Sequence, residues 1–87
     1  MNFEFAKSLS GHDKERIYLV VARDGRFAYL ADGRLHTGTR PKKKNEKHFQ
    51  VIKEIPEEIR MRLEENDMPS DDIIRWAVRT YERSINK

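Results

Sequence analysis

The spacing of apolar residues along the chain changes at Pro56. Before this proline, apolar side chains stand in short β-branched and aromatic runs separated by turn residues, a pattern typical of strands. After it, they recur every three or four positions, a pattern typical of amphipathic helices. The chain is therefore predicted to be mainly β, with a helical C-terminal part.

The part before Pro56 contains five predicted strands. The run at 16–23 is the strongest, because it is long, β-branched and aromatic enough for a central strand. Two Asp-Gly-Arg triplets, at 24–26 and 32–34, supply the positive φ that tight turns need. The predicted strands span residues 6–10, 16–23, 27–30, 35–39 and 48–52. Five short strands within about fifty residues favour a small barrel, which leaves no exposed edge.

Two short helices are predicted after the strands. The first begins at Pro56, since proline suits the first helical position, and ends near residue 66 before a break at 67–69. Its apolar face contains Ile55, Ile59 and Leu63, and Met61 lies off this stripe. The second begins after Ser70, a favourable N-cap. Its apolar face is formed by Ile73, Trp76, Ala77, Val78 and Tyr81.

Isolated short helices are marginal in water, so their apolar faces are expected to pack against the strands or against a second copy of the chain. The sequence thus divides into residues 1–53, predicted to form the barrel, and residues 54–87, predicted to form a helical extension. A chain of 87 residues has room for one small core.

Charge is distributed unevenly between these two parts. Residues 1–53 hold 12 Lys or Arg against 6 Asp or Glu, a net charge of +6, and residues 54–87 hold 6 against 9, a net charge of −3. The basic charge is densest at 39–48, where five Lys or Arg accompany one acidic residue, Glu46. Like charges are hard to bury together, so an exposed basic loop is expected here. Such a surface indicates a polyanion partner, and RNA is the natural candidate, whereas the acidic tail disfavours direct RNA contact.

Other function classes find little support. The chain has no cysteine, which excludes disulfides and thiolate metal sites. His12, His36 and His48 lack metal-ligand spacing, and no phosphate loop, nucleophile turn or catalytic carboxylate pair can be recognised. We therefore expect no catalysis, cofactor or metal. No apolar run reaches the roughly 20 residues of a membrane span, and the first residues lack a signal-peptide pattern, so a cytoplasmic location is expected.

Several segments resemble a known family. Residues 9–14, Leu-Ser-Gly-His-Asp-Lys, with the apolar run at 17–22, resemble the KOW motif of ribosomal and transcription-associated proteins. Residues 29–33, Tyr-Leu-Ala-Asp-Gly, and 40–48, Arg-Pro-Lys-Lys-Lys-Asn-Glu-Lys-His, resemble the short bacterial KOW-domain RNA-binding proteins. These are related to large-subunit ribosomal proteins of archaea and eukaryotes. The likeness covers residues from about 5 to 53 and extends to the helical tail.

The resemblance implies an SH3-like β-barrel that binds structured ribosomal RNA, associates with the ribosome and its proteins, and takes part in translation. One position departs from the pattern, because the KOW motif usually has glycine where this chain has Glu15. A glycine permits an unusual backbone angle and a close approach to a partner, whereas Glu15 restricts the angle and adds a negative charge. The basic segment at 39–48 is therefore given more weight than the first loop.

The predicted RNA-binding residues form two groups. The main contacts are expected from Arg40, Lys42, Lys43, Lys44 and Lys47, with His48 beside them, and a second line from Lys14 and Arg16. Lysines offer mobile point charges to phosphate, and arginines add planar hydrogen bonding. Folded RNA is expected to be recognised by shape and phosphate position rather than by base sequence.

Simpler interpretations remain beside these predictions. A surface lysine run often only keeps a protein soluble, and Arg26 and Arg34 are expected to be exposed simply because they follow turn glycines. Tyr18, Phe27 and Tyr29 could stack on bases, but in so small a domain they fit a core better.

An alternative function is that of a protein–protein adaptor in the translation or transcription machinery. Its support is the pair Trp76 and Tyr81 in the helical tail, because aromatic side chains anchor interfaces. The simpler interpretation is that both pack on the strands.

Overall fold

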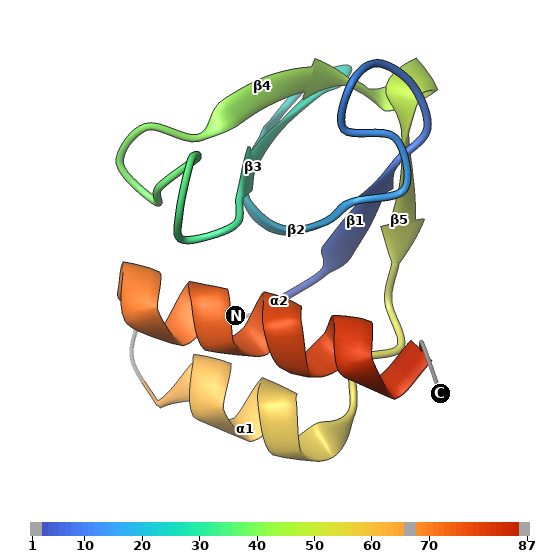
Figure 1. The fold of residues 1–87 in the computed structure, drawn as a ribbon. Coiled ribbons are helices and arrows are strands. Elements are labelled where there is room, and N and C mark those ends of the chain that lie inside the picture. Colours follow the sequence, from blue (N-terminus) through green and yellow to red (C-terminus); the bar gives the residue numbers. More distant parts are fainter. Residues whose placement is uncertain (1–2, 66–67, 86–87) are drawn as a thin grey trace.

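The computed structural model describes residues 3–65 and 68–85 and contains five strands followed by two α-helices (Figure 1). The strands are β1 (Phe5–Ser8), β2 (Ile17–Asp24), β3 (Phe27–Ala31), β4 (Lys42–Asn45) and β5 (Phe49–Ile52). A short 3-10 helix, η1 (Glu46–His48), joins β4 to β5, and the helices are α1 (Glu57–Glu64) and α2 (Asp71–Ile85). The prediction of a mainly β protein with C-terminal helices is confirmed.

The strands form one antiparallel sheet in the order β4-β3-β2-β1-β5. The sheet is curled, and its end strands β4 and β5 are consecutive along the chain (Figure 1). A bulge between Val20 and Ala22 shifts the register of β2 against β3, and bulges of this kind bend strands. Since β4 and β5 are the two ends of the sheet, the hydrogen bonding does not close it into a barrel.

The prediction of a strand at 35–39 is wrong. These residues lie in the loop between β3 and β4, and Leu35 is 75% exposed. The Asp32 carboxylate accepts hydrogen bonds from the backbone N–H groups of Arg34 (2.9 Å) and His36 (3.0 Å), so the chain turns locally instead of forming a hairpin. The fourth strand is β4, inside the basic segment. That segment is therefore a strand and a 3-10 helix rather than the predicted loop.

The sheet is buried on both faces, as the alternation along β2 shows. Ile17 and Leu19 face the helices, while Tyr18 between them belongs to a cluster inside the curl. The buried residues between sheet and helices are Phe3, Phe5, Ile17, Leu19, Ala31, Ile55, Ile59, Leu63, Ile74, Ala77 and Val78. Those inside the curl are Ala6, Tyr18, Ala28, Leu30 and Phe49.

The helix α1 contributes the apolar stripe that the sequence predicts. Ile59 and Leu63 are buried, whereas Met61 is 61% exposed. Pro56 is the N-cap of α1 rather than its first residue. The predicted helix end at residue 66 and the break at residue 67 lie outside the described residues.

The helix α2 lies across the sheet above α1 (Figure 1). Ser70 caps it as predicted, since its Oγ accepts a hydrogen bond from the Ile73 N–H (3.3 Å). Trp76 and Tyr81 are partly buried and pack against the core, where the Tyr81 ring centroid lies 4.8 Å from that of Phe5. Within residues 3–65 and 68–85, no helix has the length and apolarity needed to cross a membrane.

Candidate nucleic-acid interface

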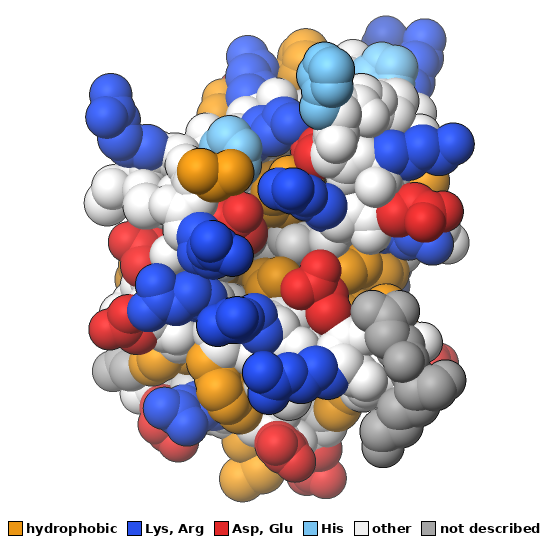
Figure 2. All heavy atoms as spheres, viewed as in Figure 1, with side chains coloured by type: hydrophobic (Ala, Val, Ile, Leu, Met, Phe, Trp, Pro, Cys, Tyr) orange, Lys and Arg blue, Asp and Glu red, His pale blue; other side chains and the backbone are white. Residues whose placement is uncertain are grey.

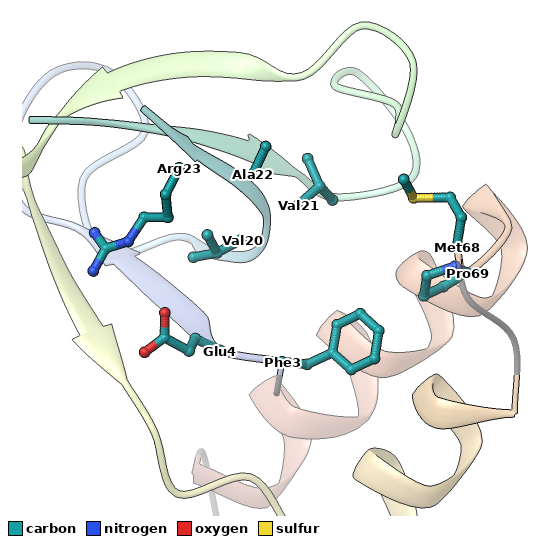
Figure 3. Close-up of a pocket in the computed structure, with 8 residues that line it drawn as sticks. All are labelled: Phe3, Glu4, Val20, Val21, Ala22, Arg23, Met68 and Pro69. Atoms are coloured by element: carbon teal, nitrogen blue, oxygen red, sulfur yellow. The ribbon is translucent and has the colours of Figure 1, made fainter. Parts of the chain in front are cut away.

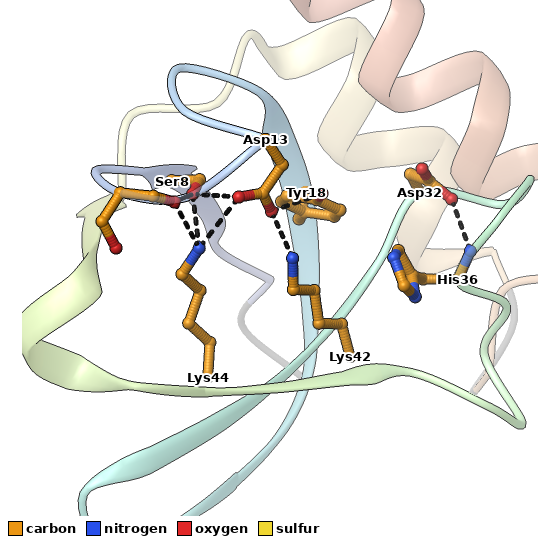
Figure 4. Close-up of polar contacts among 8 residues, drawn as sticks. Ser8, Asp13, Tyr18, Asp32, His36, Lys42 and Lys44 are labelled. Atoms are coloured by element: carbon orange, nitrogen blue, oxygen red, sulfur yellow. Dashed lines mark hydrogen bonds and ion pairs between the residues drawn. The ribbon is translucent and has the colours of Figure 1, made fainter.

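The strand β4 directs its three lysines to opposite sides, because successive side chains of a strand alternate. Lys42 and Lys44 point to Asp13, in the loop between β1 and β2 (Figure 4). The Lys42 Nζ lies 2.7 Å from Asp13 Oδ2, and the Lys44 Nζ lies 3.0 Å from Oδ1. The Lys44 ammonium also donates to the Ser8 hydroxyl (2.6 Å) and to the Ser10 carbonyl (3.1 Å).

The Asp13 carboxylate has two further donors and is nearly buried. The Tyr18 hydroxyl donates to Oδ2 (2.7 Å), and the Ser8 hydroxyl donates to Oδ1 (2.9 Å). Burial alone would raise the pKa of Asp13, but the hydrogen bonds from Lys42, Tyr18, Lys44 and Ser8 together hold that pKa far below its usual value. Burial, followed by the bond to Asp13, raises the pKa of Tyr18 well above its usual value. We call these five residues the Asp13 cluster.

The Asp13 cluster changes the role of two predicted RNA-binding residues. The Lys44 side chain is only 10% exposed and that of Lys42 is 32% exposed. The expectation that the whole lysine run lies free in solvent is therefore wrong for Lys44, and Lys42 is engaged as well. Both ion pairs therefore join β4 to the loop at 9–16. The missed signal was the two-residue spacing of Lys42 and Lys44, which places them on one side of a strand.

The other predicted residues remain on the surface. Those exposed to solvent are Lys14, Arg16, Arg40, Lys43, Lys47 and His48. Among the residues that the structure describes, none of these six takes part in an ion pair. The Lys43 Nζ lies 4.4 Å from the centroid of the half-buried Phe27 ring, so its ammonium group lies over an aromatic face while the residue stays exposed to solvent.

The backbone beneath these cations is held by local hydrogen bonds. The Arg40 N–H donates to the Thr37 hydroxyl (3.1 Å), and the Lys47 N–H donates to the Asn45 side-chain oxygen (3.0 Å), which caps η1. In the space-filling view, Lys and Arg side chains gather over β4 and η1 and again over α2 (Figure 2). Arg16 lies by α2 rather than by β4, since it lines a groove together with Arg75 and Arg79.

Of the three aromatic residues considered for base stacking, Tyr18 belongs to the core, as the simpler interpretation predicts. It is only 1% exposed and cannot stack on a base. Phe27 and Tyr29 are half-buried.

An apolar pocket of about 200 Å³ lies elsewhere, between β2 and the segment before α2 (Figure 3). Phe3, Val21 and Met68 line one side, and Glu4 and Arg23 line the other (Figure 3). Its charged groups do not form a recognisable catalytic set. Within the described part of the chain, no group of three or more His, Cys, Asp or Glu is arranged to hold a metal ion.

The sequence matches no protein-family model and no curated protein.

Proposed function

We propose that this protein binds RNA without catalysing a reaction, through the exposed cations of the segment 39–48. The proposal rests on the exposure of Arg40, Lys43 and Lys47 and on their lack of ion pairs. All three are exposed, and none of them takes part in an ion pair within the described residues, although Asp13 has engaged the two lysines between them. Exposed cations without acidic partners are the groups that neutralise phosphates and release counterions.

The resemblance to KOW-domain proteins supports the proposal. Glu15 has a φ of +73°, the left-handed conformation for which the KOW pattern uses glycine. The position therefore keeps the backbone angle although it has lost the glycine. We further propose that the curled sheet, whose strands β1, β2 and β4 are linked by the Asp13 cluster, corresponds to the SH3-like barrel of that family. The proposed partner is structured ribosomal RNA in the cytoplasm, near ribosomal proteins.

The proposed mechanism is electrostatic capture of the phosphate backbone. Arg40 precedes β4, Lys43 projects outward from it, and Lys47 and His48 follow in η1, so their charges are spread along one continuous segment. Such an array reads the positions of phosphates, hence the shape of a folded RNA, and not the identity of its bases. Lys14, in the loop held by Asp13, would extend the contact.

The decisive experiment measures the salt dependence of binding to a fluorescently labelled RNA hairpin. Four phosphate contacts give a log–log slope of affinity against salt of about −3. The double variant Lys43→Gln/Lys47→Gln should make this slope shallower by about 1.5, because each lost contact contributes about 0.7–0.9. These substitutions spare Lys42 and Lys44, so the Asp13 cluster remains intact.

A matched control is Lys53→Gln/Arg60→Gln, which removes two exposed charges from a different depression, lined also by Phe3 and Glu4. This control should retain the wild-type slope. A wild-type slope near zero, or equal losses in both double variants, would contradict the proposal. Salt-independent recovery of a protein partner, with no RNA binding, would favour the adaptor alternative instead.

A further inference from the structure

Five arginines from separate parts of the chain gather beside α2. Four of them line one groove of about 230 Å³ with Asp32 and Glu82; they are Arg16, Arg34, Arg75 and Arg79. A second groove along α2 is lined by Arg75, Arg79 and Arg83, together with Asp72, Trp76 and Thr80. Because Arg75 and Arg79 line both grooves, the two form one continuous surface. We call it the arginine groove.

The fold places these side chains in two ways. Arg75, Arg79 and Arg83 are four residues apart in α2 and therefore lie along one face of the helix. Arg34 is brought to the same place by Gly33, which packs directly on the first turn of α2. A Cβ on Gly33 would lie 2.7 Å from the Arg75 backbone nitrogen and would also meet the Asp71 carbonyl oxygen. The Gly38 N–H secures the same loop by donating to the Asp71 carboxylate (2.8 Å).

The row of Arg75, Arg79 and Arg83 does not serve to stabilise α2. Like charges four residues apart destabilise a helix, and here two such pairs follow each other. Arg75 has a partner in Asp72 (2.6 Å), but within the described residues Arg79 and Arg83 form no ion pair. A ligand of opposite charge would compensate the row.

Most of the negative charge of the tail lies outside α2. Residues 54–67 hold six Asp or Glu against two Arg, whereas α2 holds three of each. Within α2, Asp71 and Asp72 stand in the first turn, and Glu82 stands between Arg79 and Arg83 in the C-terminal half, so the charges of the helix itself balance. The net charge of residues 54–87 therefore says little about the arginine groove, and the sequence-based argument against RNA contact by the tail does not apply to this face.

We propose that the arginine groove binds the sugar–phosphate backbone of the same RNA as a second contact line, so that α2 belongs to the RNA interface. This inference rests on the proposed function. Arginine suits the task, because its planar guanidinium binds phosphate oxygens through paired hydrogen bonds. Arg16, which the sequence assigns to RNA contact, would act here. The carboxylates of Asp32 and Glu82 also line the groove and would repel a phosphate placed next to them. The Asp32 carboxylate already accepts hydrogen bonds from the backbone N–H groups of Arg34 and His36.

The test uses Arg79→Gln/Arg83→Gln in the full-length protein, with the same labelled RNA hairpin. Both arginines are exposed, and glutamine has nearly the same helix propensity, so the melting temperature should not change. The salt slope should become shallower by about 1.5. Arg79→Lys/Arg83→Lys, which keeps the charge, should keep the slope, and Lys53→Gln/Arg60→Gln again serves as the control.

Trp76 supplies a local readout. It is the single tryptophan of the chain and lines the groove beside Arg79 and Arg83. RNA binding should change its fluorescence at the same midpoint as the hairpin anisotropy, and this change should disappear in Arg79→Gln/Arg83→Gln. The free variant and free wild type should give the same emission spectrum.

The outcomes separate the two proposals. If Lys43→Gln/Lys47→Gln weakens binding, while the arginine variant behaves like the control and the Trp76 emission stays constant, the arginine groove is not an RNA site and the proposed function stands. If the arginine variant loses binding to polyglutamate but not to RNA, the groove takes an acidic protein segment, and the inference is overturned. If wild type shows no salt-dependent RNA binding, both proposals fail.

Discussion

At the scale of single residues, Asp13 decides what the basic segment can do. From the sequence, this segment offers a row of equivalent cations, but in the structure Lys42 and Lys44 are engaged by one carboxylate and Lys43 is not. A buried charge is tolerated only when it is paired and hydrogen-bonded, and Asp13 meets this condition through four side chains. The charge of a segment is therefore a poor measure of the charge it presents to a ligand.

Replacement of Asp13 by asparagine should destabilise the fold strongly, because the Lys44 ammonium would stay buried without a counter-charge. Breaking such a buried pair costs roughly 3–5 kcal/mol in the free energy of unfolding, which chemical denaturation can measure. Asp72→Asn is the matched control. It also breaks an Asp ion pair, but an exposed one with Arg75, so its cost should be at most about 1 kcal/mol. Similar losses in both variants would contradict a structural role of the Asp13 cluster.

The same cluster predicts a dependence of stability on acid. The pKa of Asp13 is lowered in the folded state, so between about pH 5 and pH 1 the unfolded chain binds more protons than the folded one. The stabilisation is present above the unfolded pKa and is lost as pH falls toward the folded pKa. Denaturation at several pH values should show that the difference between wild type and Asp13→Asn shrinks on acidification. A constant difference across this range would contradict the prediction.

At the scale of elements, two turns with identical triplets have different tasks. Gly25 and Gly33 both have positive φ, of +59° and +80°. Gly25 joins β2 to β3, and an added Cβ would meet nothing within 4 Å, whereas Gly33 touches the backbone of α2. The sequence cannot reveal this difference, because the contact of Gly33 is with a helix almost forty residues further along the chain.

Gly33→Ala should therefore be far more destabilising than Gly25→Ala. Both variants force alanine into the left-handed region, which costs about 1–2 kcal/mol. In Gly33→Ala the new methyl group would also lie 2.9 Å from the Arg75 Cβ, so α2 must shift from the sheet. The difference in melting temperature between the two variants measures this packing. Equal melting temperatures would show that α2 does not rest on the turn.

The elements that the sequence predicts well are those with strong local patterns. The run before Gly25 and the stripe of Ile59 and Leu63 mark β2 and α1 within a few residues. The strand β4 was missed because lysine and asparagine have low strand propensity, and its strand geometry comes from pairing with β3. The Asp13 cluster depends on such long-range pairing, and the arginine groove depends on the contact between the turn at Gly33 and α2. Only the row of Arg75, Arg79 and Arg83, spaced four residues apart in one helix, can be recognised in the sequence.

At the scale of the whole molecule, the sheet and the helices share a hydrophobic core, although the two parts of the chain differ in net charge. The cluster between them contains residues from β1, β2 and β3 and from both helices. The basic N-terminal part therefore has no complete core of its own on that face.

Removal of residues 56–87 should consequently prevent stable folding. The deletion exposes Phe5, Ile17 and Leu19, and each large apolar side chain that loses its burial costs about 1.5–3 kcal/mol, against a total stability of about 5–15 kcal/mol for a domain. Circular dichroism of the truncated chain should show no cooperative melting. In the full-length chain, Leu63→Ala should cost about 2–5 kcal/mol, and the exposed Met61→Ala on the same helix very little. A truncated chain that melts like wild type would contradict the shared core.

The Asp13 cluster also has a consequence for the thermodynamics of binding. Because Lys42 and Lys44 fasten β4 to the loop at 9–16, the backbone that carries Arg40, Lys43 and Lys47 is ordered before any ligand arrives. Ordering a flexible segment on association consumes part of the interaction energy, and a rigid strand avoids most of that loss. A peptide with the sequence of residues 39–48 would carry more free charge than the folded protein, yet it would have to surrender far more conformational entropy to hold the same phosphates.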